Sequence, residues 1–134
     1  MEIRKPEIIE KVWGYEEIMV RNDKYCGKRL HLNEGYESSN HRHPKSETFY
    51  IESGLVYLEL ENSRGKIETA FLEPKDIIDI GFNQWHKFSG LENSIIIETS
   101  TPDVESERRT QSRQIPNFEK WKQAKLFKFY QNLK

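Results

Sequence analysis

The middle of the chain alternates short apolar stretches with turn-forming residues. Seven short stretches that contain apolar residues occupy 15–20, 25–32, 47–52, 55–61, 66–72, 76–80 and 94–99. Segments containing Gly, Asn, Asp and Ser separate them, and none of these segments has the period of about 3.6 residues that marks a helix. Many short strands joined by turns are typical of an antiparallel sandwich or barrel. We therefore predict an all-β domain over residues 1–101.

The pattern changes after residue 101. Residues 102–116 are polar and charged, which predicts a solvated connecting arm. Residues 117–134 predict an amphipathic helix, with Asn117 as the N-cap and lysines between the apolar positions. These apolar positions recur at every third residue: Phe118, Trp121, Ala124, Phe127 and Tyr130. We expect this aromatic face to pack on the barrel or on a partner subunit, and binding to a membrane surface is the alternative.

Composition narrows the classes of partner. A chain of 134 residues suits one domain, and 21 Lys and Arg against 22 Asp and Glu leave a net charge of −1, so we expect no nucleic acid partner. An apolar run of 18 residues and a signal-peptide pattern are both absent from the sequence, which predicts a cytoplasmic protein without a membrane partner. The single cysteine, Cys26, fits a reducing compartment.

The densest chemical signal lies in residues 35–54, which begin and end with glycine. This segment contains His41, His43 and Glu47, three good metal ligands. Residues two apart in a strand point to the same face, so both imidazoles can converge on one ion. Residues 44–45 are a predicted turn, and Glu47 would begin the returning strand of a hairpin, across from the histidines. The alternative is a hairpin whose histidines simply lie on its solvated face.

This segment resembles the first motif of the cupin superfamily, which reads Gly, five residues, His, one, His, three, Glu, six, Gly. Every position matches. Cupins are small jelly-roll barrels, also called double-stranded β-helices, that bind a divalent metal through these ligands and a histidine from a second motif. In the second motif only the histidine, His86, is retained. The resemblance implies one divalent ion (Mn, Zn, Fe, Co or Ni) with His86 as its fourth ligand. Residues Gly81 and Asn83, which replace motif residues, still suit a turn. His31 is expected on the surface of a strand.

A closer resemblance covers about residues 13–101. The chain is similar to the sugar-isomerase-like cupins, often called the lyxose isomerase or mannose-6-phosphate isomerase family. The matching residues are Trp13, Gly14, Asn22, Tyr25, Cys26, Gly27, Lys28, Ser39, Lys45, Glu98, Ser100 and Thr101. The resemblance implies an enzyme of carbohydrate metabolism, a metal-dependent isomerase or epimerase that acts on a sugar or sugar phosphate through an enediolate.

Two residues are candidates for the catalytic work. Glu98 lies in an apolar strand, and a carboxylate that faces the interior of a barrel can act as the base that moves a proton between carbons. A structural carboxylate at the rim is the alternative. Lys45 lies in the turn beside the metal ligands, where its ammonium could hold a substrate hydroxyl or phosphate; an exposed turn lysine is the alternative.

Three residues are candidates for substrate binding. Lys28 alternates with Cys26 and two leucines, which could direct it inward, where it would need an anionic partner such as a substrate phosphate or carboxylate. Tyr50 and Tyr57 could form part of a wall on which a sugar ring stacks, together with Trp13, Tyr25 and Phe49, although strand aromatics commonly belong to the core.

Two other functions fit the same ligands. A non-haem Fe(II) dioxygenase also uses three histidines and a carboxylate with open coordination positions. A non-catalytic sugar-binding or regulatory cupin is the third reading. We further expect a homodimer, because cupins commonly pair and the aromatic helix offers a surface for it.

Overall fold

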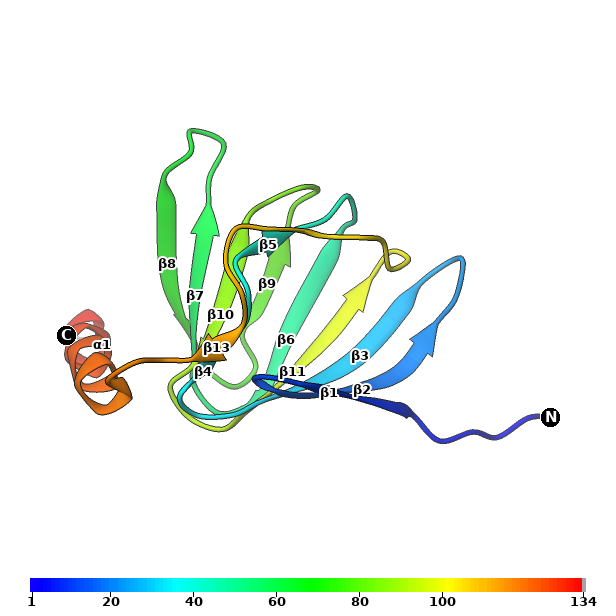
Figure 1. Cartoon of the computed structure of the whole chain (residues 1–134), viewed down its shortest axis with the longest axis horizontal. Coiled ribbons are helices and arrows are strands. Elements are labelled where there is room, and N and C mark those ends of the chain that lie inside the picture. Colours follow the sequence, from blue (N-terminus) through cyan, green and yellow to red (C-terminus); the bar gives the residue numbers. More distant parts are fainter. Residues whose placement is uncertain (134) are drawn as a thin grey trace.

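Two antiparallel sheets that face each other form the body of the protein, and a helix lies beside them in the computed structural model, which describes residues 1–133 (Figure 1). In spatial order, the first sheet contains β1 (Glu7–Lys11), β2 (Gly14–Arg21), β3 (Cys26–Leu32), β11 (Ser94–Ser100), β6 (Glu47–Ser53) and β9 (Ile77–Ile80). In the second sheet the order is β12 (Glu107–Arg108), β5 (His41–Arg42), β10 (His86–Gly90), β4 (Tyr36–Glu37) and β13 (Arg113–Gln114), and β10 also pairs with β7 (Val56–Glu61), which pairs with β8 (Ile67–Leu72). The helix is α1 (Phe118–Asn132).

The prediction of an all-β domain followed by one helix is confirmed. Each of the seven apolar stretches is a strand in the structure, as β2, β3, β6, β7, β8, β9 and β11. β1, β10 and the two-residue strands β4, β12 and β13 were not predicted, whereas β5 lies where the sequence predicted the strand that carries the histidines. The missed strand β10, with the sequence HKFSG, has little apolar character of its own, and its extended form depends on pairing with β7 over its whole length.

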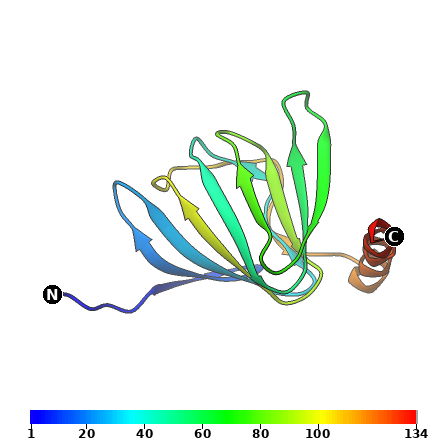
Figure 2. The same cartoon turned by 180° about the vertical axis from the view of Figure 1, so that it is seen from behind.

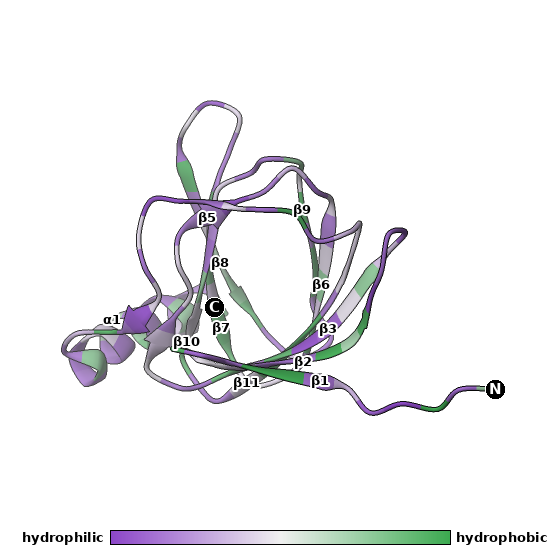
Figure 3. Ribbon diagram, turned by 45° about the vertical axis from the view of Figure 1, so that its right-hand side comes forward, coloured by the Kyte–Doolittle hydropathy of each residue, from purple (hydrophilic) through white to green (hydrophobic). Residues whose placement is uncertain are grey.

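The hydrophobic core lies between the two sheets. Figure 3 shows the strands arranged around a common interior. Side chains from both sheets meet there: Trp13, Leu30, Leu32, Phe49, Ile51, Val56, Leu58, Leu72, Ile80, Phe88 and Ile96. The alternation expected of a strand with one buried face is clear in β6, where Glu47, Phe49 and Ile51 are buried and the residues between them are half-buried. Strand β6 therefore directs Glu47 inward, toward the same interior as the core.

The predicted hairpin around His41 and Glu47 is wrong. Strand β5 pairs with β10 and β12 in the second sheet, whereas β6 pairs with β11 and β9 in the first. Residues 44–45 do turn the chain, and the Lys45 amide donates to the His43 carbonyl at 2.8 Å. This turn carries the chain from one sheet to the other. A local pattern can indicate a turn, but it cannot tell whether the following strand pairs with the preceding one.

Residues 101–114 form an arm across one end of the sheets. In Figures 1 and 2 this segment leaves the end of β11, passes over the strands toward β5 and descends to β13. Several contacts hold it: the Asn40 amide donates to Thr110 Oγ1 at 3.0 Å, and Arg113 Nε donates to Glu37 Oε1 at 2.6 Å. The Arg109 guanidinium also lies 3.9 Å from the centre of the Trp85 ring. The second half of the arm is thus bound to the second sheet, where its strands β12 and β13 pair with β5 and β4.

Helix α1 packs on the outside of the second sheet. Trp121, Leu126 and Phe129 contact a separate buried cluster that includes Tyr57 and Leu91. Of the predicted apolar face, Trp121 packs on the second sheet, whereas Phe127 is 65% exposed and Tyr130 is 58% exposed in the single chain. A spacing of three residues drifts around a helix of about 3.6 residues per turn, so residues at every third position do not stay on one face. Asn117 stands at the N-cap, but its side chain makes no capping hydrogen bond.

One structural finding bears on the prediction that the protein has no membrane partner. Among residues 1–133, the structure contains no helix with the length and apolar character needed to cross a membrane. The cytoplasmic location stays a prediction.

Candidate metal centre and its cavity

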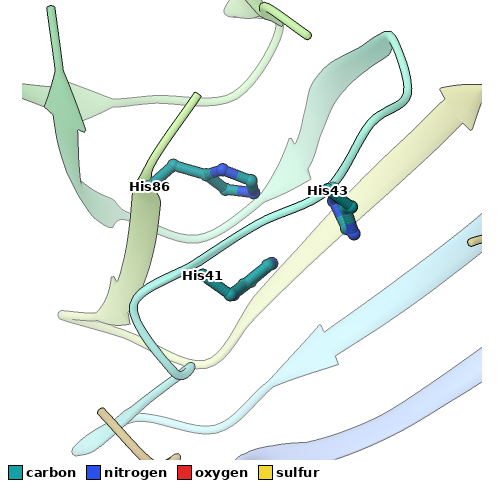
Figure 4. Close-up of side chains that lie close together, drawn as sticks. All are labelled: His41, His43 and His86. Atoms are coloured by element: carbon teal, nitrogen blue, oxygen red, sulfur yellow. The ribbon is translucent and has the colours of Figure 1, made fainter. Parts of the chain in front are cut away.

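Three histidines from two segments meet inside the protein. His41 on β5, His43 just beyond it and His86 at the start of β10 each offer a ring nitrogen, and these nitrogens lie within 4.8 Å of one another. Figure 4 shows the three rings turned toward one another. Strand pairing explains part of this, because His41 and His86 are direct partners in the register of β5 and β10. His41 from the first motif and His86 from the second therefore lie side by side because they are opposite each other on paired strands.

Hydrogen bonds orient two of the rings. His41 Nδ1 lies 2.8 Å from the Ser39 carbonyl oxygen, and His86 Nδ1 lies 2.8 Å from that of Gln84. A carbonyl oxygen only accepts, so we assign the proton to Nδ1 in both rings, which leaves the Nε2 lone pairs for a cation. His86 Nε2 is buried and has no hydrogen-bond partner among residues 1–133. A buried, unpartnered acceptor beside two further imidazoles fits a metal ion.

The charge state of the histidines suits the same role. Burial lowers the pKa of His41 to about 4 and that of His86 to about 3. Both imidazoles are therefore neutral near pH 7, and a neutral imidazole is the form that binds a metal. A cation would therefore meet a free lone pair, and no proton, at Nε2 of these two rings.

Glu47 lies at the edge of the histidine cluster. Its Oε1 is 2.6 Å from His43 Nε2 and 3.7 Å from His86 Nε2, and its side chain is almost fully buried. Three imidazole nitrogens and one carboxylate oxygen form a donor set that suits Zn, Fe, Mn, Co or Ni. The residues predicted from the sequence as ligands, His41, His43, Glu47 and His86, are thus brought together.

The histidines open into a cavity of about 780 Å³ between the sheets. Trp13, Phe49 and Phe88 supply apolar walls, while Lys28 and Glu98 supply charge. Residues of the arm also line this cavity, including Asp103, Glu105 and Arg108. The space is in the range of small-molecule sites, and its mixture of apolar walls and a few polar groups is typical of them.

Glu98 faces the cavity and is only 4% exposed. Its Oε2 accepts hydrogen bonds from Lys45 Nζ at 3.0 Å and from Ser100 Oγ at 2.8 Å. Within residues 1–133, Glu98 Oε1 accepts no hydrogen bond, which leaves one oxygen of this carboxylate available to a ligand. The orientation that the sequence left open for Glu98 is therefore inward.

Lys45 and Lys28 are also buried, at 3% and 7% exposure. Lys45 Nζ lies 2.6 Å from Asp103 Oδ1, and Lys28 Nζ lies 2.8 Å from Asp103 Oδ2. Burial alone would lower the pKa of Lys45, but the charges of Glu98 and Asp103 raise it well above its usual range. Burial would raise the pKa of Asp103, yet hydrogen bonds from Lys28 and Lys45 lower it to about 2. All three groups are ionised near pH 7.

A second group of donors, Cys26, Glu98 and Asp103, is also close enough to share an ion. The two carboxylates already pair with buried ammonium groups, and Lys28 lies near the cysteine. Positive charge at these positions disfavours a further cation. The three histidines are the better metal centre.

The structure does not bring every predicted binding residue to the cavity. Tyr57 packs against Phe71 and Trp121 beneath the helix, and Tyr50 is not among the residues that line the cavity. Strand alternation separates Tyr50 from its inward neighbour Phe49. Tyr25 is 54% exposed. Of the predicted aromatic wall, Trp13 and Phe49 line the cavity.

Asp103 lies at the site although the sequence did not predict it as a site residue. It lies in a polar segment with several carboxylates, and nothing local distinguishes it from its neighbours. Its role comes from the path of the arm, which brings it to Lys28 and Lys45. His31, which was predicted on the surface of a strand, lies outside the histidine cluster. Its Nε2 is 2.7 Å from Glu17 Oε1, and its ring stacks on Tyr15. Asn83 adopts a φ of 56°, as expected for a left-handed turn residue.

Comparison with known proteins gives one relative and one set of similar folds. The D-lyxose/D-mannose isomerase of Thermosediminibacter oceani is 34% identical over 77 residues, which cover 52% of this chain and 41% of that protein. The match thus spans less than half of the isomerase. No family model matches the chain.

Solved structures of Bacillus subtilis oxalate decarboxylase share the fold. The structure at pH 4.6 gives a TM-score of 0.71 at 14% identity, covering 78% of this chain and 30% of that one. A deletion mutant of the same enzyme gives a TM-score of 0.71 at 13% identity, with the same coverage. At such identities the likeness shows the fold alone.

Proposed function

Because this chain has the cupin fold, we propose that it is a metal-dependent enzyme that isomerises or epimerises a sugar or sugar phosphate through an enediolate. The observation that carries the proposal is the placement of a three-histidine cluster and the carboxylate of Glu98 on one cavity. The partial relative that acts on D-lyxose and D-mannose supports a sugar as the substrate class.

His41, His43, His86 and Glu47 would hold the metal. A bound divalent ion supplies Lewis acidity, which stabilises negative charge that develops on oxygens next to a carbonyl. These four side chains leave positions on a six-coordinate ion for two further oxygens. The neutral imidazoles and the backbone carbonyls that fix their rings keep the cluster ready for the ion.

Glu98 is the proposed base. Removing the weakly acidic proton next to a carbonyl requires an acceptor that reaches the carbon, and Oε1 of Glu98 has no hydrogen-bond partner in the described chain. Lys45 and Ser100 bond the other oxygen, which fixes the carboxylate in one orientation. A proton taken from one carbon by Oε1 could be returned from the same atom to the neighbouring carbon.

The apolar walls have a separate role. Trp13 and Phe49 line the cavity and can lie against the carbon face of a sugar ring. Phe49 is the direct cross-strand partner of Glu98, and a sugar held against it would displace water from this carboxylate, which strengthens the electrostatic interactions there. Selection among sugars would depend on hydroxyl contacts with these walls and with the buried charged groups.

The proposal is tested by metal analysis followed by solvent hydrogen exchange. Protein loaded with Mn, Zn, Fe or Co is incubated in deuterated buffer with a panel of aldoses and aldose phosphates, and deuterium at C2 is followed by NMR. We expect exchange with at least one sugar, a metal:protein ratio near one, and loss of exchange in Glu98→Gln with metal content retained. Glu52→Gln is the control, because Glu52 pairs with Arg29 on the outer face and does not line the cavity.

Other results would favour the other two functions. If the Fe(II) form consumes oxygen and shows no hydrogen exchange under anaerobic conditions, the protein would be a dioxygenase. The three-histidine donor set also suits Fe(II). Sugar binding that is unaffected by His41→Ala, with no turnover in either protein, would support a non-catalytic binding protein. Absence of exchange with every sugar in all four metal forms would contradict isomerisation.

A further inference from the structure

The carboxylate of Asp103 bridges two buried ammonium groups. One oxygen lies 2.6 Å from Lys45 Nζ and the other lies 2.8 Å from Lys28 Nζ. The two lysines come from different places, the turn before β6 and the middle of β3, and Asp103 comes from the arm after β11. Three separate segments therefore meet at one carboxylate.

Two adjacent buried ammonium groups need negative charge nearby, because an unpaired charge in a cavity is costly. A ligand phosphate or carboxylate placed between them could supply it. In this protein the chain supplies it: Glu98 bonds Lys45 at 3.0 Å, and Asp103 bonds both lysines. The buried carboxylate of Glu98 and the half-buried carboxylate of Asp103 thus balance the two buried ammonium groups before any ligand enters.

We propose that Asp103 is a specificity-determining residue that occupies the anion position between Lys28 and Lys45 and thereby reserves the cavity for uncharged substrates. A phosphate or carboxylate group directed at the lysines meets the negative charge of Asp103, and it must displace this side chain from both ammonium groups. An uncharged hydroxyl meets neither obstacle. This inference deepens the proposed function, because it names the charge class of the substrate. It rests on the proposed function for the reaction that the substrate undergoes, whereas the filled anion position can be tested without that reaction.

The arm makes this occupation a fixed property of the fold. The Thr101 amide donates to the Ser46 carbonyl at 3.0 Å, and the Arg109 amide donates to the Asn40 carbonyl at 2.9 Å, so the segment on each side of Asp103 is held by backbone hydrogen bonds. Arg21 lies 3.8 Å from Asp103 Oδ2 and adds a further positive neighbour. Removing the charge of Asp103 would leave an array of cations without their shared partner.

The first test uses metal-free protein, so it does not depend on the proposed reaction. Inorganic phosphate is titrated into wild type and Asp103→Asn, and heat of binding is measured by calorimetry. We expect Asp103→Asn to bind phosphate at least about tenfold more tightly than wild type. Combining this change with Lys28→Met should remove the gain, because one of the two ammonium groups is then missing.

Two variants control for simpler explanations. Glu105→Gln removes one negative charge from the same arm and the same cavity, and it has no ion pair with either lysine in the described structure, so its phosphate affinity should match wild type. Asp103→Glu keeps the charge and should also behave as wild type. Equal phosphate affinity in wild type and Asp103→Asn, or an equal gain in Glu105→Gln, would overturn the proposal.

A second measurement covers the case in which Asp103→Asn does not fold. Metal-loaded wild type is titrated with an aldohexose and with its 6-phosphate. We expect the uncharged sugar to bind at least about tenfold more tightly. Equal or tighter binding of the phosphate would overturn the proposal. If neither sugar binds, the proposed function fails, and the inference about Asp103 is then tested by titrating inorganic phosphate into the wild type alone. Saturable binding of phosphate at submillimolar concentration would contradict it, because the anion position would not be filled by Asp103.

Discussion

The ammonium of Lys45 lies 2.6 Å from the carboxylate of Asp103, although 58 residues separate them in the sequence. Lys45 stands in the turn between two predicted metal ligands, His43 and Glu47, and Asp103 stands in the arm that crosses the cavity. The contact therefore links the metal segment to the arm. It also means that the arm contributes to stability and to the shape of the site.

Replacing Lys45 by Met should destabilise the protein by about 3 kcal/mol, because removing one partner of a buried ion pair leaves the other charge uncompensated. Here Glu98 would lose the ammonium that bonds its Oε2, and Asp103 would keep Lys28 but lose the closer of its two lysine partners. Urea unfolding followed by circular dichroism measures the change. Lys24→Met, at an exposed position, should stay within about 0.5 kcal/mol of wild type. A similar small effect for Lys45→Met would show that the buried pair adds nothing to stability.

Replacing His86 by Ala should abolish stoichiometric metal binding. This ring supplies the buried Nε2 that has no hydrogen-bond partner in residues 1–133, and it lies beside His41 and His43. Loss of a direct ligand should weaken metal affinity by at least ~100-fold, more than the loss of an outer hydrogen bond. Competition with a chromogenic chelator measures the affinity. His31→Ala is the matched control, since His31 pairs with Glu17 away from the cluster, and its metal content should be unchanged.

Metal-free protein should lose stability as the pH falls from about 6.5 toward 4. In the unfolded chain, His41 and His86 bind protons near their usual pKa of 6.5, whereas burial lowers the pKa values in the folded protein to about 4 and about 3. Between these values the unfolded state binds more protons, so acid favours unfolding, by up to roughly 2–3 kcal/mol per pH unit for both groups. Asp103 adds its own loss only below its usual pKa of 3.8.

Urea midpoints measured from pH 7.5 to pH 4.5 test this dependence. The double variant His41→Gln, His86→Gln removes both titrating rings and should show a flatter profile over the same range. A wild-type midpoint that does not change between pH 6.5 and pH 5 would contradict the buried, neutral state of the two histidines.

Replacing Trp121 by Ala should separate the helix from the second sheet. Trp121 packs edge to face on Tyr57 with ring centres 5.9 Å apart, so its loss should cost roughly 1–2 kcal/mol. Tyr130→Ala, on the exposed side of α1, should cost less than about 0.5 kcal/mol. Thermal unfolding measures both. A larger effect of the Tyr130 change that depends on protein concentration would instead indicate that this face contacts a second subunit, as the predicted homodimer requires.

The strands of the central region could be predicted because each carries its own signal. β6 and β11 combine β-branched or aromatic residues with alternating burial, and glycine or polar residues bound them. Strands such as β5 and β12, of two residues each, lack a signal of that kind. They exist because the arm lies beside β5 and exchanges backbone hydrogen bonds with it, a contact between distant segments.

By itself, the sequence determined the ligand types and their spacing, the all-β class and the final helix, because these depend on residue identity and on periods of a few residues. Tertiary structure alone decided that His41 pairs across from His86, that Glu98 faces inward and that Asp103 reaches both buried lysines. The physical reason is that sheet pairing and the path of the arm bring together residues far apart in the chain, and no local pattern records which partner each buried charge will meet.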